Sequence, residues 1–192
     1  MNIVFGHTKS KSGEFSYVEL YNAFSAYMRA ILKEMYRKEP TKIIHKAAGD
    51  KTIPFSKISE LKTFENIENY VIESVFRKLE EERSTLKLLN KILENTKVTI
   101  DEDVKNKALM YLEMRHLFIH NDGQADAEFI SKYSSIIKFK QDAKTNNTKL
   151  PTDFTQVYTA IEAVQALLAE IDKQLLFSDF IDPRKYAPTK QK

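Results

Sequence analysis

Apolar residues recur at alternating spacings of three and four along most of this chain, a pattern that favours amphipathic helices. The last such stretch, from Phe154 to Leu175, keeps the alternation throughout its length. The 192 residues include only four glycines, too few for a β protein with many turns. Helices that each carry one apolar stripe must bury it against one another. The sequence therefore predicts an all-α, up-and-down bundle of four to six helices.

Prolines, glycines and capping residues give the expected helix ends. Six helices are predicted, over residues 16–38, 57–82, 85–95, 101–121, 125–137 and 154–175. Phe64 and Val75 belong to the expected inward face of the second helix, and Ser84 is the expected cap of the third. The polar stretch 140–151 is expected to be a loop, and His7 and His45 are expected in loops.

The length predicts a single helical domain over residues 1–178, followed by an extended basic tail over residues 179–192. The chain has no cysteine, which excludes disulfide scaffolds, thiolate metal sites and cysteine nucleophiles. No apolar stretch approaches the roughly 20 residues that span a bilayer. A cytoplasmic protein without a membrane partner and without a cofactor is expected. The net charge of +3 permits an anionic partner but does not require one.

One arginine breaks the apolar pattern of the helix expected over residues 101–121. On a helical wheel it falls within a stripe of roughly 80° that is otherwise apolar. The stripe comprises Val104, Ala108, Tyr111, Arg115 and Phe118. An arginine is almost never fully buried without a partner. Arg115 must therefore meet a carboxylate, reach an interface or line a cleft that receives an anion.

A structural interpretation and a metal interpretation compete for this segment. Arg115 could form a buried ion pair with an acid on a neighbouring helix, and His120 could satisfy the last carbonyls of its own helix. Alternatively, Glu113, His116 and His120 fall within about 60° on the wheel and could present ligands to a metal ion. This metal interpretation lacks the glutamate that directly follows the first histidine in H-E-x-x-H, and no further ligand is apparent.

Cleavage of a phosphodiester is the remaining interpretation. A histidine exchanges protons near neutral pH, and an arginine fork holds a phosphate. Together they suffice to cleave RNA without a metal, through attack by the 2′-OH, so that DNA would be inert. Arg115 and His120 lie about 140° apart on an ideal helix. They converge only if the helix loosens at residues 121–123, or if a two-fold homodimer shares the site.

The segment R-H-L-F-I-H, residues 115–120, resembles the R-x4-6-H signature of the HEPN superfamily. The continuation H-N-D-G-Q-A-D, followed by Phe129, is similar to that of one group of prokaryotic HEPN proteins. The resemblance implies a helical bundle that dimerises to build a metal-independent endoribonuclease site. It also implies a role as a toxin or an effector of antiviral defence such as abortive infection, often restrained by an antitoxin or other partner protein.

By this resemblance Arg115 would bind the scissile phosphate, His120 would act as general base or acid, and His116 would assist. Asn121 and Asp126 would shape the loop after the helix. One branch of the superfamily has a regulatory tyrosine two residues after the motif histidine, where this chain has Asp122. That difference argues against control by an antitoxin nucleotidyltransferase. Some relatives lack catalysis, so a nucleotide- or protein-binding module on the same fold is the alternative.

Basic residues that could guide RNA fall into two groups, each in or near an expected loop. Of these residues, Lys132 and Lys138 are the candidate RNA contacts, together with Asn121. An ordinary solvated surface would look the same. The groups are Lys42, Lys46, Lys51, Lys57 and Lys62, and Lys132, Lys138, Lys140, Lys144 and Lys149.

Overall fold

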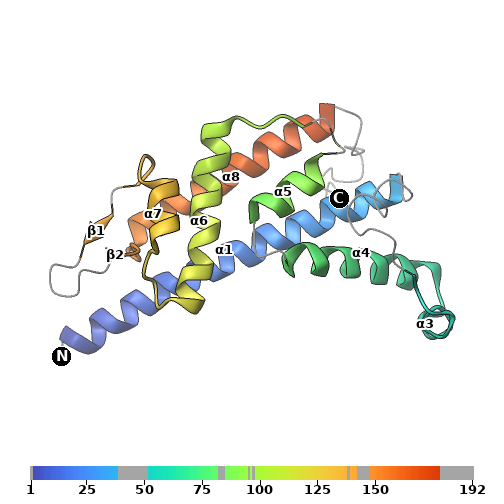
Figure 1. Cartoon of the computed structure of the whole chain (residues 1–192), viewed down its shortest axis with the longest axis horizontal. Helices are drawn as coiled ribbons and strands as arrows, with labels where there is room; N and C mark the ends of the chain where they lie inside the picture. The colour runs from blue at the N-terminus through green and yellow to red at the C-terminus, as the bar shows by residue number, and fades with distance from the viewer. Residues whose placement is uncertain are drawn as a thin grey trace, which may run out of the picture. The chain divides into compact units, whose positions relative to one another are not determined.

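The structure is a computed structural model that describes residues 2–38, 52–81, 85–94, 96, 98–137, 139–141 and 148–177 (Figure 1). Seven helices and two very short strands account for most of these residues. They are α1 (Asn2–Lys38), α3 (Phe55–Leu61), α4 (Phe64–Glu81), α5 (Thr85–Leu93), α6 (Glu102–His120), α7 (Ala127–Tyr133), β1 (Lys140–Gln141), β2 (Thr148–Lys149) and α8 (Phe154–Phe177). The prediction of an all-α helical bundle is confirmed.

The chain divides into two compact units, and the long helices α1 and α8 each contribute to both. The first unit contains Met1–Phe24 and Ile100–Glu170. The second contains Ser25–Thr99 and Ile171–Lys192. The expected tail over residues 179–192 lies outside the described residues, as do His45, Ser84 and the lysines at positions 42, 46, 51, 138 and 144. None of the described helices has the length and apolar character needed to cross a membrane.

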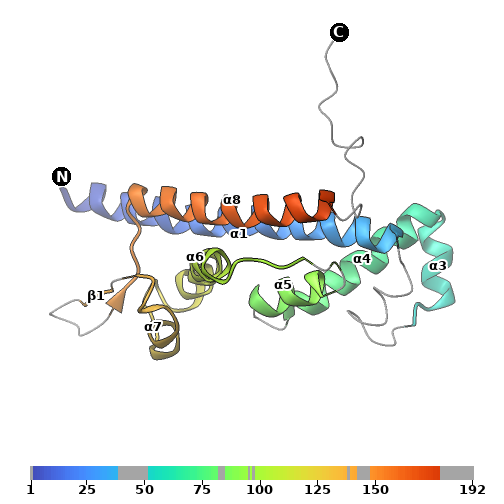
Figure 2. The same ribbon diagram turned by 90° about the horizontal axis from the view of Figure 1, so that it is seen from above.

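The first unit is built around a core that α1, α6, α7 and α8 share. Within this unit α1 and α8 run side by side in the same direction, and α6 crosses them with α7 beside it (Figures 1 and 2). The aromatic rings of Tyr17 and Phe118 stack with centroids 5.1 Å apart, which joins α1 to α6. Other buried members of the core include Met110, Tyr111, Met114, Leu117, Phe129, Tyr133, Val157, Ala160 and Ala163.

Local signals place α6 within this core. The Asp101 carboxylate caps the first turn by accepting hydrogen bonds from the backbone N–H groups of Asp103 and Val104. At the other end, the Gly123 N–H donates to the Leu117 carbonyl at 3.0 Å. Gly123 adopts a φ of +70°, a conformation that glycine takes without strain. These two ends confirm the predicted bounds of the helix to within a residue.

Helix α1 starts at Asn2, well before the predicted start at residue 16, so the loop expected around His7 is wrong. The chain passes through Gly13, where a Cβ atom would lie 2.1 Å from the Thr152 carbonyl oxygen. A glycine here therefore allows the α1 backbone to approach the segment before α8. The periodicity of apolar residues missed this part of the helix, because a backbone contact leaves no apolar side chain in the pattern.

Replacing Gly13 by alanine is expected to destabilise the protein, although alanine is the better helix former by about 1 kcal/mol. The added methyl group overlaps the backbone carbonyl of Thr152, which cannot move aside as a flexible side chain could. Overpacking of this kind costs roughly 1–3 kcal/mol, so the free energy of unfolding should fall. Thermal unfolding measures the change, with Ser12→Ala on the exposed side of the same turn as a control. A more stable Gly13→Ala variant would contradict the close approach.

The helix predicted over residues 57–82 is two helices. Lys62 has a φ of +61° between α3 and α4, which ends α3. Phe64 starts the new helix and is 78% exposed, so its assignment to the inward face is wrong, whereas Val75 is buried as predicted. The loop predicted over residues 140–151 contains the strands β1 and β2, which pair antiparallel.

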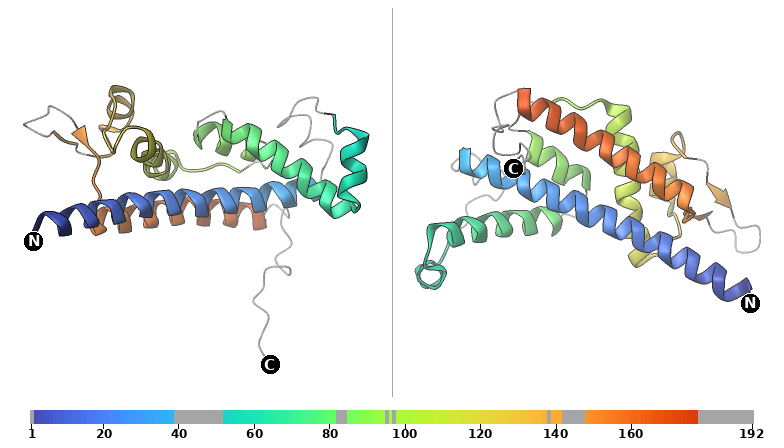
Figure 3. Two further views of the ribbon diagram at one scale, coloured as in Figure 1. Left: turned by 90° about the horizontal axis from the view of Figure 1, so that it is seen from below. Right: turned by 180° about the vertical axis from the view of Figure 1, so that it is seen from behind.

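In the second unit the later part of α1 packs with α4 and α5 (Figure 3). Buried apolar residues of these helices form its core, among them Met28, Leu32, Phe76 and Leu89. The Tyr27 hydroxyl donates a 2.6 Å hydrogen bond to the Asp172 carboxylate. Burial, reinforced by that carboxylate, raises the Tyr27 pKa.

Candidate functional site

The motif residues occupy the last two turns of α6, in the first unit. Met114, Leu117 and Phe118 point into the core and are buried. On the opposite side the helix is open, because His116, Ile119 and His120 are exposed. Arg115 is partly buried and lies at the edge of this open face, next to α1. The end of α6 therefore combines a buried apolar face with an open face that carries two imidazoles and has a cation at its edge.

The Arg115 guanidinium lies over the ring of Tyr21 on α1, with Cζ 4.5 Å from the ring centroid. Its Nε atom is buried and has no hydrogen-bond partner among the described residues. No carboxylate of the described residues forms an ion pair with it. The ion-pair interpretation of Arg115 therefore finds no support in the part of the chain that the structure describes.

His116 and His120 are neighbours on the open face, one helical turn apart. Their ring centroids are 4.6 Å apart and the rings are inclined by 46°. Both side chains are exposed, so a ligand approaching the end of α6 can reach them. Two imidazoles in contact can supply both a proton acceptor and a proton donor.

The angular spread of these groups limits what one chain can do. Taking 100° per residue from Arg115, Ile119 falls at about 40°, His116 at about 100° and His120 at about 140°. The helix remains α-helical through His120, so its end does not loosen early enough to bring Arg115 and His120 together. Ile119, which is 47% exposed, lies between the cation and the imidazoles.

The Glu113 carboxylate accepts hydrogen bonds from two side chains of α7. The donors are the Tyr133 hydroxyl at 2.8 Å and Lys132 Nζ at 2.9 Å. Burial raises the pKa of Tyr133, and the negative charge of Glu113 raises it further. Because Glu113 is engaged in this way, it is poorly placed to join His116 and His120 around a metal ion. No group of three potential metal ligands occurs among the described residues.

The loop after α6 is held by two of the singled-out polar residues. The Asn121 amide donates to the Gln124 carbonyl at 2.7 Å. The Asp126 carboxylate caps α7 by accepting from the Phe129 N–H at 2.8 Å. Both contacts are of the loop-shaping kind that the family resemblance implies, and an RNA contact of Asn121 stays a prediction.

Two of the lysines expected to guide RNA are engaged in ion pairs among the described residues. Lys132 forms its ion pair with Glu113, and Lys57 pairs with Glu60 at 2.7 Å. Both are thereby partly neutralised. The candidate contact Lys138 lies outside the described residues.

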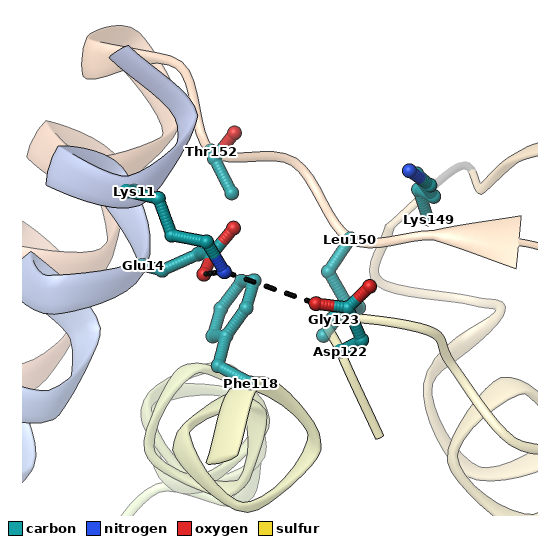
Figure 4. A pocket seen from close by; sticks show the side chains of 8 residues that line it. All are labelled: Lys11, Glu14, Phe118, Asp122, Gly123, Lys149, Leu150 and Thr152. Carbon is teal, nitrogen blue, oxygen red and sulfur yellow. Dashed lines mark hydrogen bonds and ion pairs between the residues drawn. The ribbon is translucent and has the colours of Figure 1, made fainter. Parts of the chain in front are cut away.

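A cavity of about 110 Å³ lies beside the C-terminal end of α6, between α1 and the segment that leads into α8 (Figure 4). Lys11 Nζ reaches Glu14 at 2.8 Å and Asp122 at 3.8 Å within it. The hydrogen bond from Lys11 to Glu14 is the main cause that raises the Lys11 pKa. Phe118, Gly123 and Lys149 complete much of the wall. Because two carboxylates face two lysines, the cavity has little net charge with which to attract a phosphate.

Sequence reasoning singled out Arg115 and both histidines but did not predict the contact between Tyr21 and Arg115. Tyr21 belongs to the apolar stripe of α1, where a tyrosine looks like any core aromatic. Its position under Arg115 depends on how α1 and α6 cross, which no local pattern encodes.

No model of a known protein family, no curated protein and no solved structure matches this chain.

Proposed function

We propose that this chain is a metal-independent endoribonuclease of the HEPN type. The observation that carries the proposal is the state of Arg115, which is stacked on Tyr21 and has no carboxylate partner among the described residues. Its charge is therefore available to an anion. The adjacent His116 and His120 supply imidazoles, which can accept and donate protons.

The chemistry is transfer of the phosphodiester to the neighbouring 2′ oxygen. One imidazole removes the proton from the 2′-OH, and this oxygen attacks the adjacent phosphorus. The bond from phosphorus to the 5′ oxygen breaks, and that oxygen takes a proton from a second imidazole or from water. The products are a 2′,3′-cyclic phosphate and a free 5′-OH. Arg115 stabilises the charge that develops on the phosphoryl oxygens.

The site is proposed to be shared by two copies of the chain. Within one copy Arg115 and His120 point about 140° apart. A two-fold axis near the open face of α6 would set the arginine of one copy opposite the histidines of the other. The exposed Ile119 would then be buried between them. In the cell, such an activity suits a toxin or antiviral effector that a partner protein restrains.

The proposal is tested by incubating the purified protein with single-stranded RNA in EDTA. We expect cleavage that leaves cyclic phosphate ends, and none of an oligonucleotide whose only change is 2′-deoxyribose at the cleaved position. Cleavage of that substituted oligonucleotide would exclude the 2′-OH mechanism. Activity that requires added metal would favour a metal centre instead, and binding of RNA without cleavage would favour a non-catalytic module.

A further inference from the structure

The residue that contacts the Arg115 guanidinium is a tyrosine from a different helix. Tyr21 lies on α1, is partly buried, and presents its ring 4.5 Å from Arg115 Cζ. A cation placed over an aromatic face within about 6 Å of the centroid is attracted by the quadrupole of the ring. The contact therefore restricts where the guanidinium can lie.

Two other arginines among the described residues lie close to carboxylates. Arg37 pairs with Glu34 at 3.0 Å and with Glu68 at 3.2 Å. Arg29 lies over the Phe76 ring and also approaches the Glu73 carboxylate at 3.8 Å. A carboxylate neutralises the arginine that it positions, whereas an aromatic ring positions it and leaves the charge intact. Among the described residues, Arg115 is positioned by an aromatic ring and therefore keeps its full charge.

The Nε–H of Arg115 is buried and lacks an acceptor among the described residues, which is unfavourable for folding. The Nε–H of Arg29 also lacks an acceptor among these residues, but the Glu73 carboxylate lies 3.8 Å from it. Arg115 has no such ion pair among the described residues, so the Tyr21 ring is the contact that holds its side chain.

We propose that Tyr21 is a positioning residue, which holds Arg115 in place for a phosphate without reducing its positive charge. This inference rests on the proposed ribonuclease function for its catalytic consequence. The aromatic face is what matters, because the face of phenylalanine attracts a cation as well. The hydroxyl group of Tyr21 is not required.

The test compares Tyr21→Phe with Tyr21→Leu in the full chain. Tyr21→Phe keeps the ring and is expected to retain cleavage, whereas Tyr21→Leu is expected to lower kcat/KM by between about 2-fold and 30-fold. Tyr158→Leu makes the same exchange at an exposed position of α8 and serves as the matched control. Equal activity of the leucine and phenylalanine variants at equal folded content would overturn the proposal.

A second measurement reads the position of Arg115 without any activity. In a ¹⁵N–¹H NMR spectrum, the Arg115 Nε–H should exchange slowly with water in the wild type and in Tyr21→Phe. Its assignment follows from its disappearance in Arg115→Lys. In Tyr21→Leu the signal should shift and exchange quickly, and an unchanged signal would refute positioning. If the Arg115 Nε–H signal changes in Tyr21→Leu but the wild type cleaves no RNA, the ribonuclease proposal fails. The positioning of Arg115 by Tyr21 then still stands.

Discussion

Replacing Arg115 by alanine is expected to reduce RNA cleavage by roughly a hundredfold to a thousandfold, the usual effect of removing one donor that stabilises charge in a transition state. Folding should change much less. The side chain has no ion pair among the described residues and leaves one buried N–H without an acceptor. Its loss therefore removes a ring contact of about 1 kcal/mol together with an unfavourable burial. Single-turnover cleavage in EDTA and thermal unfolding measure the two effects separately.

Two further variants sharpen this test. Arg115→Lys keeps the charge but loses the planar fork that binds a phosphate through two hydrogen bonds, so it should restore only part of the activity. Arg29→Ala removes an arginine that also lies over a ring, at 4.4 Å from Phe76, and should lower stability without a loss of cleavage. Full activity in Arg115→Ala would identify the cleavage as a contaminant or the chain as a binding module.

The sequence was sufficient wherever a local signal determined the structure. Asp101 and Gly123 define the ends of α6 through their own backbone and side-chain chemistry, so both ends could be predicted. Arg115 could be recognised because it interrupts an apolar stripe, and the anomaly is visible on the helix alone. The approximate 140° between Arg115 and His120 likewise follows from the regular geometry of α6.

The sequence was insufficient where two distant segments meet. The close approach of α1 to the segment before α8 depends on the fit of Gly13 against the Thr152 carbonyl, and no spacing of residues along α1 encodes that contact. Tyr21 and Arg115 come together because α1 and α6 cross at one place. The engagement of Glu113 by Lys132 and Tyr133 also requires α7 to pack on α6. Tertiary packing therefore decided which of the candidate groups remain available for chemistry.

Replacing His120 by alanine is expected to lower cleavage by roughly a hundredfold to ten-thousandfold, the range for loss of a general acid or base. The exposed side chain contributes little to the core, so the unfolding temperature should stay close to that of the wild type. His116→Ala should have a smaller effect, because the proposal gives His116 an assisting role. Equal losses in the two histidine variants would instead indicate that both imidazoles transfer protons.

A mixture of the two inactive variants, Arg115→Ala and His120→Ala, distinguishes a shared site from one built within a single chain. If each site takes its arginine from one copy and its histidine from the other, a mixed dimer contains one intact pair. Random exchange of subunits makes about half of the dimers mixed, so activity should recover to about a quarter of the wild-type value. If both groups came from the same chain, the mixed dimer would have no intact site and activity would stay at the level of the separate variants. Complementation that disappears on dilution below the dimer dissociation constant would support the shared site further, because it would tie the recovered activity to the paired state.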